Sequence, residues 1–193
     1  MGMFDPCIGM CDADHASSRI GEDRKSTSGY LFYLFNCLIS WKSKLQPIVA
    51  TSTHEAELVA LSVCADEAVW LRKLLTELGF AINHHYFIRN PDMATRPTYN
   101  DDDEPINEDH KFFRELPILC DNQGSVHTAG NNDTGARSKA IDTRWFKIRE
   151  FITRGLVRVH HIAGITNVAD CLTKPLTNRF GWYRSMLGLD THI

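Results

Sequence analysis

The sequence predicts one α/β domain, with a mixed sheet of five strands, the first three antiparallel, and helices on both faces. Three short segments rich in β-branched and aromatic residues come first, and one long amphipathic helical pattern follows them. Further apolar strands are then separated by helical segments, as crossover connections require. The expected order is β-β-β-α-β-α-α-β-α. The chain has 193 residues, of which 43% are hydrophobic, so we expect a single domain over residues 1–193 rather than two.

The three N-terminal strands are predicted from local composition and turn residues. Residues 8–12 form a short apolar segment that ends at Asp12. Residues 29–35 and 38–44 are rich in aromatic and branched side chains, with a turn near Asn36 between them. Strands joined by such short connections pair antiparallel, so a meander is the expected arrangement.

A long amphipathic helix follows the strands. Ser52 and Glu55 have the spacing of a capping box, which marks a helix start. Apolar side chains then recur on one helical face until Gly79, where the pattern stops. This apolar stripe consists of Leu58, Leu61, Ala65, Ala68, Leu71, Leu75 and Leu78.

Residues 80–116 interrupt the regular pattern. Pro91, Pro97, Pro105 and an acidic run within residues 101–109 cannot continue a regular element, so we expect an irregular insertion. The acidic residues of this run together carry more negative charge than the net charge of the whole chain, which is −3. The overall charge therefore does not exclude a nucleic-acid partner.

Regular structure is expected again from Pro117. Residues 118–120 form a short apolar strand that ends at Asp121, and residues 122–129 suit a short helix before a loop over 130–135. The remaining elements are a helix over 141–153, an alternating strand over 157–161, and a last helix that begins at 168–172 and is interrupted by Pro175.

Composition argues against a membrane protein and against a disulfide framework. The apolar runs are short, and the N-terminus lacks the features of a signal peptide. We therefore expect a soluble intracellular protein, in the cytoplasm, in virus-like particles or in the nucleus. The cysteines are scattered without a CxxC pair, so reduced and mostly buried thiols are expected. They are Cys7, Cys11, Cys37, Cys64, Cys120 and Cys171.

Four acidic residues occupy positions that suggest a metal site. Asp12 and Asp121 each end an apolar strand, Glu57 lies in the first turns of the long helix, and Asp170 lies at the start of the last helix. Parallel strands that end side by side would bring Asp12 and Asp121 together. Clustered carboxylates repel one another without a cation, and Mg²⁺ prefers hard oxygen ligands. The spacing alone also suits helix caps, turns and contacts with helix dipoles.

A resemblance to a known family chooses between these interpretations. The blocks DADHASS, DRKSTSGYLF, ISWKSKLQP, STHEAELVALS, ILCDNQ, SKAIDTRWFKIRE and VADCLTKPL occur in this order. Together they resemble the ribonuclease H region that follows the reverse transcriptase in copia-type retrotransposon polyproteins, over nearly the whole chain apart from the insertion. The resemblance implies a ribonuclease H-like fold, with Asp12, Glu57, Asp121 and Asp170 as metal ligands. Asp14 then becomes a supporting or loop residue, and Glu55 the helix cap.

The same resemblance implies a function. The family hydrolyses the RNA strand of RNA–DNA hybrids with two Mg²⁺ ions, which Mn²⁺ can replace, and leaves 3′-hydroxyl and 5′-phosphate ends. The implied partners are the hybrid and a reverse transcriptase domain of the same polyprotein. Hybrid recognition should depend on 2′-hydroxyls and on minor-groove shape.

Two alternatives remain open. One is a catalytically inactive relic or domesticated fragment that acts as a nucleic-acid-binding or assembly module. The other is an integrase or transposase nuclease on the same fold, which is disfavoured because the long helix follows three strands and carries a ligand. The chain also departs from the family pattern, since Ala140 and Phe146 stand where histidines are usual and His15 replaces an aromatic residue. These departures concern substrate contacts more than metal binding.

Several other residues are weaker candidates. Trp41 and Trp145 have the spacing of core residues more than of stacking platforms. The pairs His84–His85 and His160–His161 do not predict a metal site, because adjacent strand residues point to opposite faces. A set of basic residues is expected near phosphates, although a solvated basic face is equally compatible. The set is Lys42, Lys44, Arg137, Lys139, Arg144 and Lys147.

Overall fold

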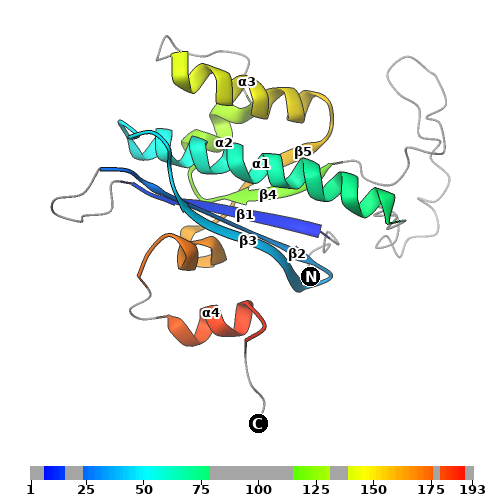
Figure 1. Ribbon diagram of the computed structural model, residues 1–193. Coiled ribbons are helices and arrows are strands. Elements are labelled where there is room, and N and C mark those ends of the chain that lie inside the picture. The colour runs from blue at the N-terminus through cyan, green and yellow to red at the C-terminus, as the bar shows by residue number, and fades with distance from the viewer. Residues whose placement is uncertain (1–6, 16–23, 79–114, 131–138, 176–178, 190–193) are drawn as a thin grey trace.

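The computed structural model describes residues 7–15, 24–78, 115–130, 139–175 and 179–189. For residues 139–142 it describes the backbone only. Within the described residues, five strands form one mixed sheet in the order β3-β2-β1-β4-β5 (Figure 1). The strands are β1 (Cys7–Asp14), β2 (Thr27–Leu34), β3 (Cys37–Leu45), β4 (Leu116–Cys120) and β5 (Val157–His161). This confirms the predicted sheet.

The antiparallel part of the sheet is a meander of β1, β2 and β3. β2 and β3 are joined by Phe35 and Asn36, which both have positive φ, at 49° and 64°. Two successive residues of this kind make a turn whose twist matches that of the flanking strands. The turn predicted near Asn36 is therefore present, and it fixes the register that pairs Leu34 with Cys37.

The parallel part of the sheet brings distant segments together. β1 pairs in parallel with β4, with Gly9 opposite Ile118 and Cys11 opposite Cys120. β4 pairs in parallel with β5. Because the paired residues Cys11 and Cys120 directly precede Asp12 and Asp121, these two aspartates lie beside one another. Asp121 directly follows β4, whereas Asp12 lies within β1, which continues to Asp14 and not only to Asp12 as predicted.

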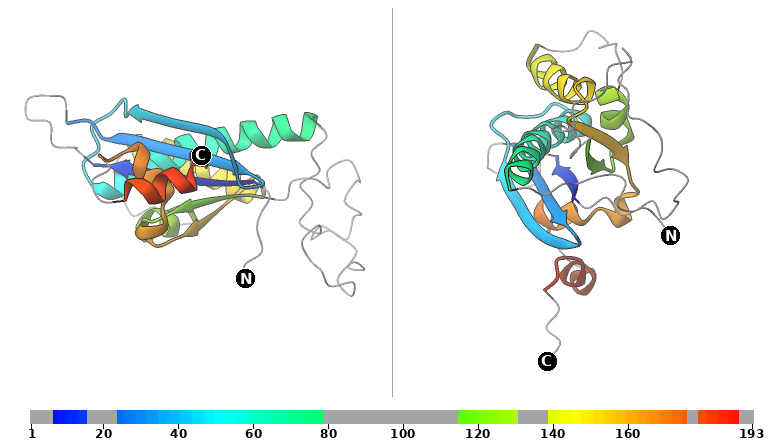
Figure 2. Two further views of the ribbon diagram at one scale, coloured as in Figure 1. Left: turned by 90° about the horizontal axis from the view of Figure 1, so that it is seen from below. Right: turned by 90° about the vertical axis from the view of Figure 1, so that its right-hand side faces the viewer.

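Among the described elements, three helices cover one face of the sheet (Figures 1 and 2). They are α1 (Thr53–Glu77), α2 (Gln123–Gly130) and α3 (Lys139–Thr153). α1 begins as the sequence predicts, because Ser52 accepts a hydrogen bond from the Glu55 backbone N–H at 3.1 Å. The Glu55 carboxylate in turn accepts from the Thr51 N–H and hydroxyl, each at 2.7 Å. The main core lies between these helices and the sheet and includes Phe32, Leu61 and Trp145.

In the described part of the chain, the opposite face carries two short 3-10 turns and one short helix. These are η4 (Gly164–Thr166), η5 (Val168–Leu172) and α4 (Phe180–Met186). A smaller core of Leu31, Tyr33, Val168 and Tyr183 lies between them and the sheet. The prediction that residues 168–172 begin a last α-helix is wrong, since they form a single 3-10 segment that ends before Pro175. α4 was not predicted.

The two tryptophan predictions have different outcomes. Trp145 is a core residue, 1% exposed, and its indole N–H donates to the Thr128 carbonyl at 2.6 Å. Trp41 is 61% exposed on β3 at the edge of the sheet, so its predicted core position is wrong.

The predicted insertion at 80–116 and loop at 130–135 lie almost entirely outside the described residues. No helix in the described part of the chain has the length and apolar character needed to cross a membrane.

Candidate metal centre

Asp12 is the most buried member of the site. It lies on β1, is 0% exposed, and accepts a hydrogen bond from the Thr173 hydroxyl. Its neighbour on β2 is Gly29, where a Cβ atom would lie 2.8 Å from side-chain atoms of Leu172 and Thr173. A glycine at this position therefore allows the η5 segment to approach the sheet closely enough to reach Asp12.

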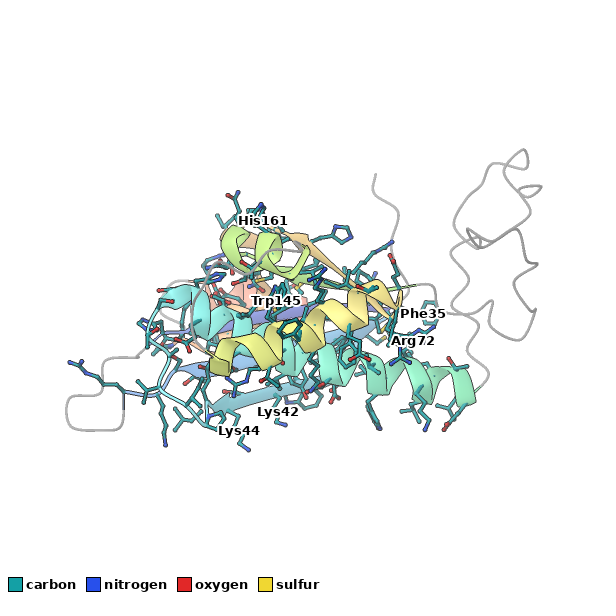
Figure 3. The ribbon with its side chains drawn as sticks, turned by 90° about the horizontal axis from the view of Figure 1, so that it is seen from above. Phe35, Lys42, Lys44, Arg72, Trp145 and His161 are labelled. Carbon is teal, nitrogen blue, oxygen red and sulfur yellow. The ribbon has the colours of Figure 1, made fainter. Side chains whose placement is uncertain are left out.

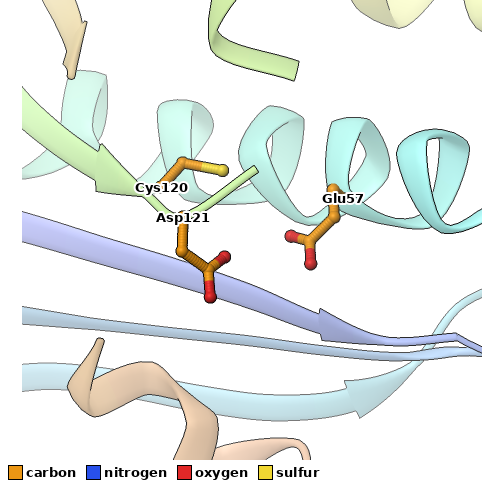
Figure 4. A group of neighbouring side chains, drawn as sticks. All are labelled: Glu57, Cys120 and Asp121. Atoms are coloured by element: carbon orange, nitrogen blue, oxygen red, sulfur yellow. The ribbon is translucent and has the colours of Figure 1, made fainter. Parts of the chain in front are cut away.

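Glu57 reaches the same region from the second turn of α1 (Figure 4). Its side chain is 4% exposed, and the Ala13 backbone N–H donates to the carboxylate. The other carboxylate oxygen, Oε2, is buried and has no hydrogen-bond partner among the described residues. A buried polar atom in this condition costs free energy unless a ligand satisfies it.

Asp121 connects two groups of side chains. It directly follows β4 and is partly exposed. Ligand atoms of Asp12, Asp121 and Asp170 lie within 4.8 Å of one another, and so do those of Glu57, Cys120 and Asp121. The structure thus brings together all four carboxylates predicted from the sequence, with Asp121 common to both groups.

Asp170 is held in place by the η5 segment. Asn167 caps this segment, because its side-chain oxygen accepts from the Ala169 N–H at 3.1 Å. The Asn167 side-chain amide also donates to the Cys11 carbonyl at 2.9 Å, and the residue is 0% exposed. Asn167 therefore ties the segment carrying Asp170 to the strand carrying Asp12.

Two carboxylates of the site, Glu57 and Asp12, have raised pKa values when no cation is present. Burial, followed by the nearby charges of Asp12 and Asp121, raises the pKa of Glu57 to about 9. Burial also raises the pKa of Asp12 to about 6, against the lowering effects of the Thr173 hydrogen bond and Lys174. A cluster with this electrostatic character has a strong tendency to attract cations.

Lys174 supplies one positive charge within the site. Its ammonium lies 2.8 Å from Asp170 Oδ1 and 3.3 Å from Asp12 Oδ2. Burial lowers the pKa of Lys174, but the hydrogen bond to Asp170 and the charges of both aspartates outweigh burial and raise it overall. The lysine therefore stays charged and offsets part of the repulsion between the carboxylates.

Sequence reasoning gave no role to Thr173, Lys174 or Asn167. The first two belong to the LTK letters of the last motif, three and four residues after Asp170, and this spacing was the available signal. His161 was also left without a role, and its Nε2 lies 3.1 Å from the Asp121 carbonyl oxygen. It thus contacts the backbone of a site residue rather than a carboxylate.

The described members of the predicted phosphate-binding set lie on two elements, β3 and α3. Lys42 and Lys44 are exposed on β3, at the edge of the sheet opposite β5 and His161 (Figure 3). Arg144 is partly exposed on α3, while Lys147 forms an ion pair with Asp66 of α1 at 2.5 Å. Arg137 lies outside the described residues, and the Lys139 side chain is also outside them.

The role of Asn167 leads to a stability prediction. Asn167→Ala removes both hydrogen bonds and leaves the Cys11 carbonyl without this donor, so we expect a loss of about 1–3 kcal/mol in the free energy of unfolding. Urea unfolding followed by circular dichroism measures this loss. Thr166→Ala is the control, because it removes a hydrogen bond at an exposed position within the same turn. An equal loss in both variants would contradict the assigned role.

Comparison with known proteins relates this site to a family. No family model matches the chain. It is 33% identical over 193 residues to the retrovirus-related Pol polyprotein from transposon TNT 1-94 of Nicotiana tabacum, an alignment that covers 99% of the chain and 12% of the polyprotein. The chain is a homologue of retrovirus-related Pol polyproteins. The Pol polyprotein from transposon RE1 of Arabidopsis thaliana is 33% identical over 179 residues, covering 92% of the chain and 10% of the polyprotein. This Pol homologue thus spans about a tenth of the length of these relatives.

Solved structures give the fold of this Pol-related segment. The N-terminal RNase H domain of Rv2228c from Mycobacterium tuberculosis has a TM-score of 0.52 at 12% identity, covering 86% of this chain and 89% of that chain. LC11-RNase H1, solved in complex with an RNA/DNA hybrid, has a TM-score of 0.51 at 13% identity, covering 86% and 93%. The fold is RNase H-like, as the sequence motifs imply.

Proposed function

We propose that this Pol-related segment hydrolyses the RNA strand of RNA–DNA hybrids, with Asp12, Glu57, Asp121 and Asp170 holding two Mg²⁺ ions. One observation carries the proposal. Four carboxylates from four separate elements converge, and one of their buried oxygens has no hydrogen-bond partner in the described part of the chain. The Pol relatives and the RNase H-like fold support the same assignment.

The donor set fits magnesium. Carboxylate oxygens are the hard ligands that Mg²⁺ selects, and Mn²⁺ accepts the same ligands. A cation near Glu57 would satisfy the unpartnered Oε2. Its positive charge would stabilise the ionised carboxylate and so oppose the effects that raise the pKa of Glu57. The carboxylates are therefore better suited to an occupied site than to an empty one.

The surrounding residues prepare the ligands for this role. Bound ions would supply an activated water molecule and stabilise the leaving oxygen of the phosphodiester. Thr173 orients the Asp12 carboxylate through its hydroxyl, and Asn167 positions the segment that carries Asp170. Lys174 is 44% exposed and places an ammonium at the edge of the site, where a phosphate of the substrate would approach.

Hybrid binding would use groups outside the metal centre. Lys42, Lys44 and Arg144 present positive charge at positions where phosphates could be contacted, while the Lys147 charge is paired with Asp66. Recognition through 2′-hydroxyls would distinguish RNA from DNA in the substrate. A reverse transcriptase domain of the same polyprotein would deliver the hybrid.

Cleavage of a labelled hybrid tests the proposal. We expect cleavage of the RNA strand with Mg²⁺ or Mn²⁺, loss of activity in EDTA that added Mg²⁺ reverses, and little activity with Ca²⁺, which prefers longer bonds and more ligands. A DNA duplex and a single-stranded RNA of the same sequence are the substrate controls. Cleavage that persists in EDTA contradicts the metal assignment. Hybrid binding without cleavage would favour the alternative of an inactive binding module.

A further inference from the structure

A sulfur atom lies among the oxygen donors of the site. Cys120 is the last residue of β4, is 0% exposed, and directly precedes Asp121. Figure 4 shows its side chain beside Asp121, with Glu57 approaching from α1. The Cys120 Sγ and one carboxylate oxygen from each of Glu57 and Asp121 all lie within 4.8 Å of one another.

A second observation indicates that this group is prepared for a ligand. Glu57 is 4% exposed, and its Oε2 is buried without a partner among the described residues. Its carboxylate is directed toward the space between α1 and the end of β4, where Cys120 and Asp121 lie (Figure 4). Asp121 is the partly exposed member, so a small ion could enter from its side.

The chemistry of sulfur selects a different ion from the one proposed above. Thiolate is a soft ligand that binds Zn²⁺ or Cd²⁺ in preference to Mg²⁺. Zinc bonds to sulfur and carboxylate oxygen in a tetrahedron place these donors about 3.6 Å apart. The three donors would therefore need only a modest contraction to bind such an ion.

We propose that Glu57, Cys120 and Asp121 form a binding site for a thiophilic divalent cation, Zn²⁺ or Cd²⁺, which excludes Mg²⁺ while it is occupied. The hydrogen bond with Cys11 and burial raise the pKa of the Cys120 thiol in the metal-free protein. A bound soft cation would have to outweigh both effects, so that the thiol releases its proton to solvent and forms a metal–sulfur bond. The exclusion of Mg²⁺ rests on the proposed function, because it requires Glu57 and Asp121 to be magnesium ligands. Binding of the soft cation itself is independent of the proposed function, because it requires only the three donor side chains.

The test is a titration of the full chain with Cd²⁺ in buffer without chelators. The ultraviolet absorbance of the cadmium–thiolate bond and calorimetry provide two readouts, neither of which needs enzymatic activity. All proteins carry Cys37→Ser, because this exposed thiol could bind the ion by itself. Cys120→Ser removes the sulfur donor. Cys64→Ser is the matched control, because Cys64 is also 0% exposed but is not part of the group.

We expect about one Cd²⁺ per chain with a thiolate absorbance band in the Cys37→Ser parent and in the Cys64→Ser protein. In the Cys120→Ser protein the band should disappear and the Cd²⁺ affinity should fall at least about tenfold. Its Mg²⁺ affinity should change much less, since Mg²⁺ does not need the sulfur. Cys120→Ala provides a second variant with the same expectation if serine at this buried position prevents folding.

The outcomes separate this proposal from the proposed function. A parent protein without a thiolate band, or a Cys120→Ser protein that binds Cd²⁺ as tightly as the parent, overturns the soft-cation site. If Cd²⁺ and Mg²⁺ bind without competing, the two sites do not overlap, and the proposed exclusion of Mg²⁺ is wrong. Cd²⁺ binding through Cys120 in a protein that does not cleave hybrids supports this site and contradicts only the proposed nuclease.

Discussion

Replacing Asp121 with asparagine is expected to reduce hybrid cleavage by roughly a hundredfold or more while the fold is retained. Asp121 belongs to both groups of ligand atoms, so its loss affects the carboxylates on either side. The amide has a similar size to the carboxylate but lacks its charge. The charge of Asp121 raises the pKa of both Asp12 and Glu57, so metal-free Asp121→Asn should be as stable as the parent or slightly more stable.

The measurement is cleavage of one defined hybrid by parent and variant proteins with matched circular dichroism. Glu77→Gln is the control, since Glu77 has an exposed side chain near the end of α1 and does not belong to either group of ligand atoms. Metal-free hybrid binding should remain nearly unchanged in Asp121→Asn, because the proposed phosphate contacts are basic residues outside both groups of ligand atoms. Equal cleavage rates for Asp121→Asn and the parent would remove Asp121 from the catalytic assignment.

The second large effect is a dependence of stability on pH in metal-free buffer. The pKa of Glu57 is raised from 4.5 to about 9 by burial and nearby charges. Between these two values the folded protein retains a proton that the unfolded chain has lost. The contribution of Glu57 to stability is therefore expected to fall as pH rises from about 4.5 toward 9, by on the order of a few kcal/mol. Asp12, with a pKa raised from 3.8 to about 6, adds a smaller decrease between those values.

Glu57→Gln should remove most of this pH dependence, because glutamine does not ionise. Urea unfolding in EDTA at several pH values between 5 and about 8.5 gives the comparison. Glu77→Gln is the control, since Glu77 lies near the end of α1 with an exposed side chain. Parallel pH profiles for the parent and Glu57→Gln proteins would show that the Glu57 carboxyl does not carry the effect.

The parts of the fold that were predictable have strong local signals. The hairpin at Phe35 and Asn36 and the start of α1 at Ser52 depend on residues within a few positions of one another. The carboxylates could be found because each lies at or near the end of an apolar strand pattern or the start of a helical one, and because the surrounding letters match a family. Local sequence was sufficient for these features since their geometry is determined locally.

The features that were missed depend on contacts between distant residues. Periodicity gives Trp41 and Trp145 similar patterns, but only the sheet order places Trp41 on an edge strand and Trp145 in the core. The η5 segment is shaped by its packing over Gly29 and by the bond from Asn167 to Cys11, more than 130 residues away along the chain. Thr173 was overlooked for the same reason, since its partner is Asp12 on the first strand.

The order of the proposed ligands along the chain would couple metal binding to the folding of the protein. Asp12 comes from the first strand and Asp170 from one of the last described segments, so an unfolded chain would have to close a very long loop to assemble the site. Ions should therefore bind the native state almost exclusively, and at a concentration a hundred times their dissociation constant they would add about 2.7 kcal/mol to stability. The midpoint of thermal unfolding should then rise with metal concentration, so a melting curve can serve as a binding isotherm for this centre without any substrate.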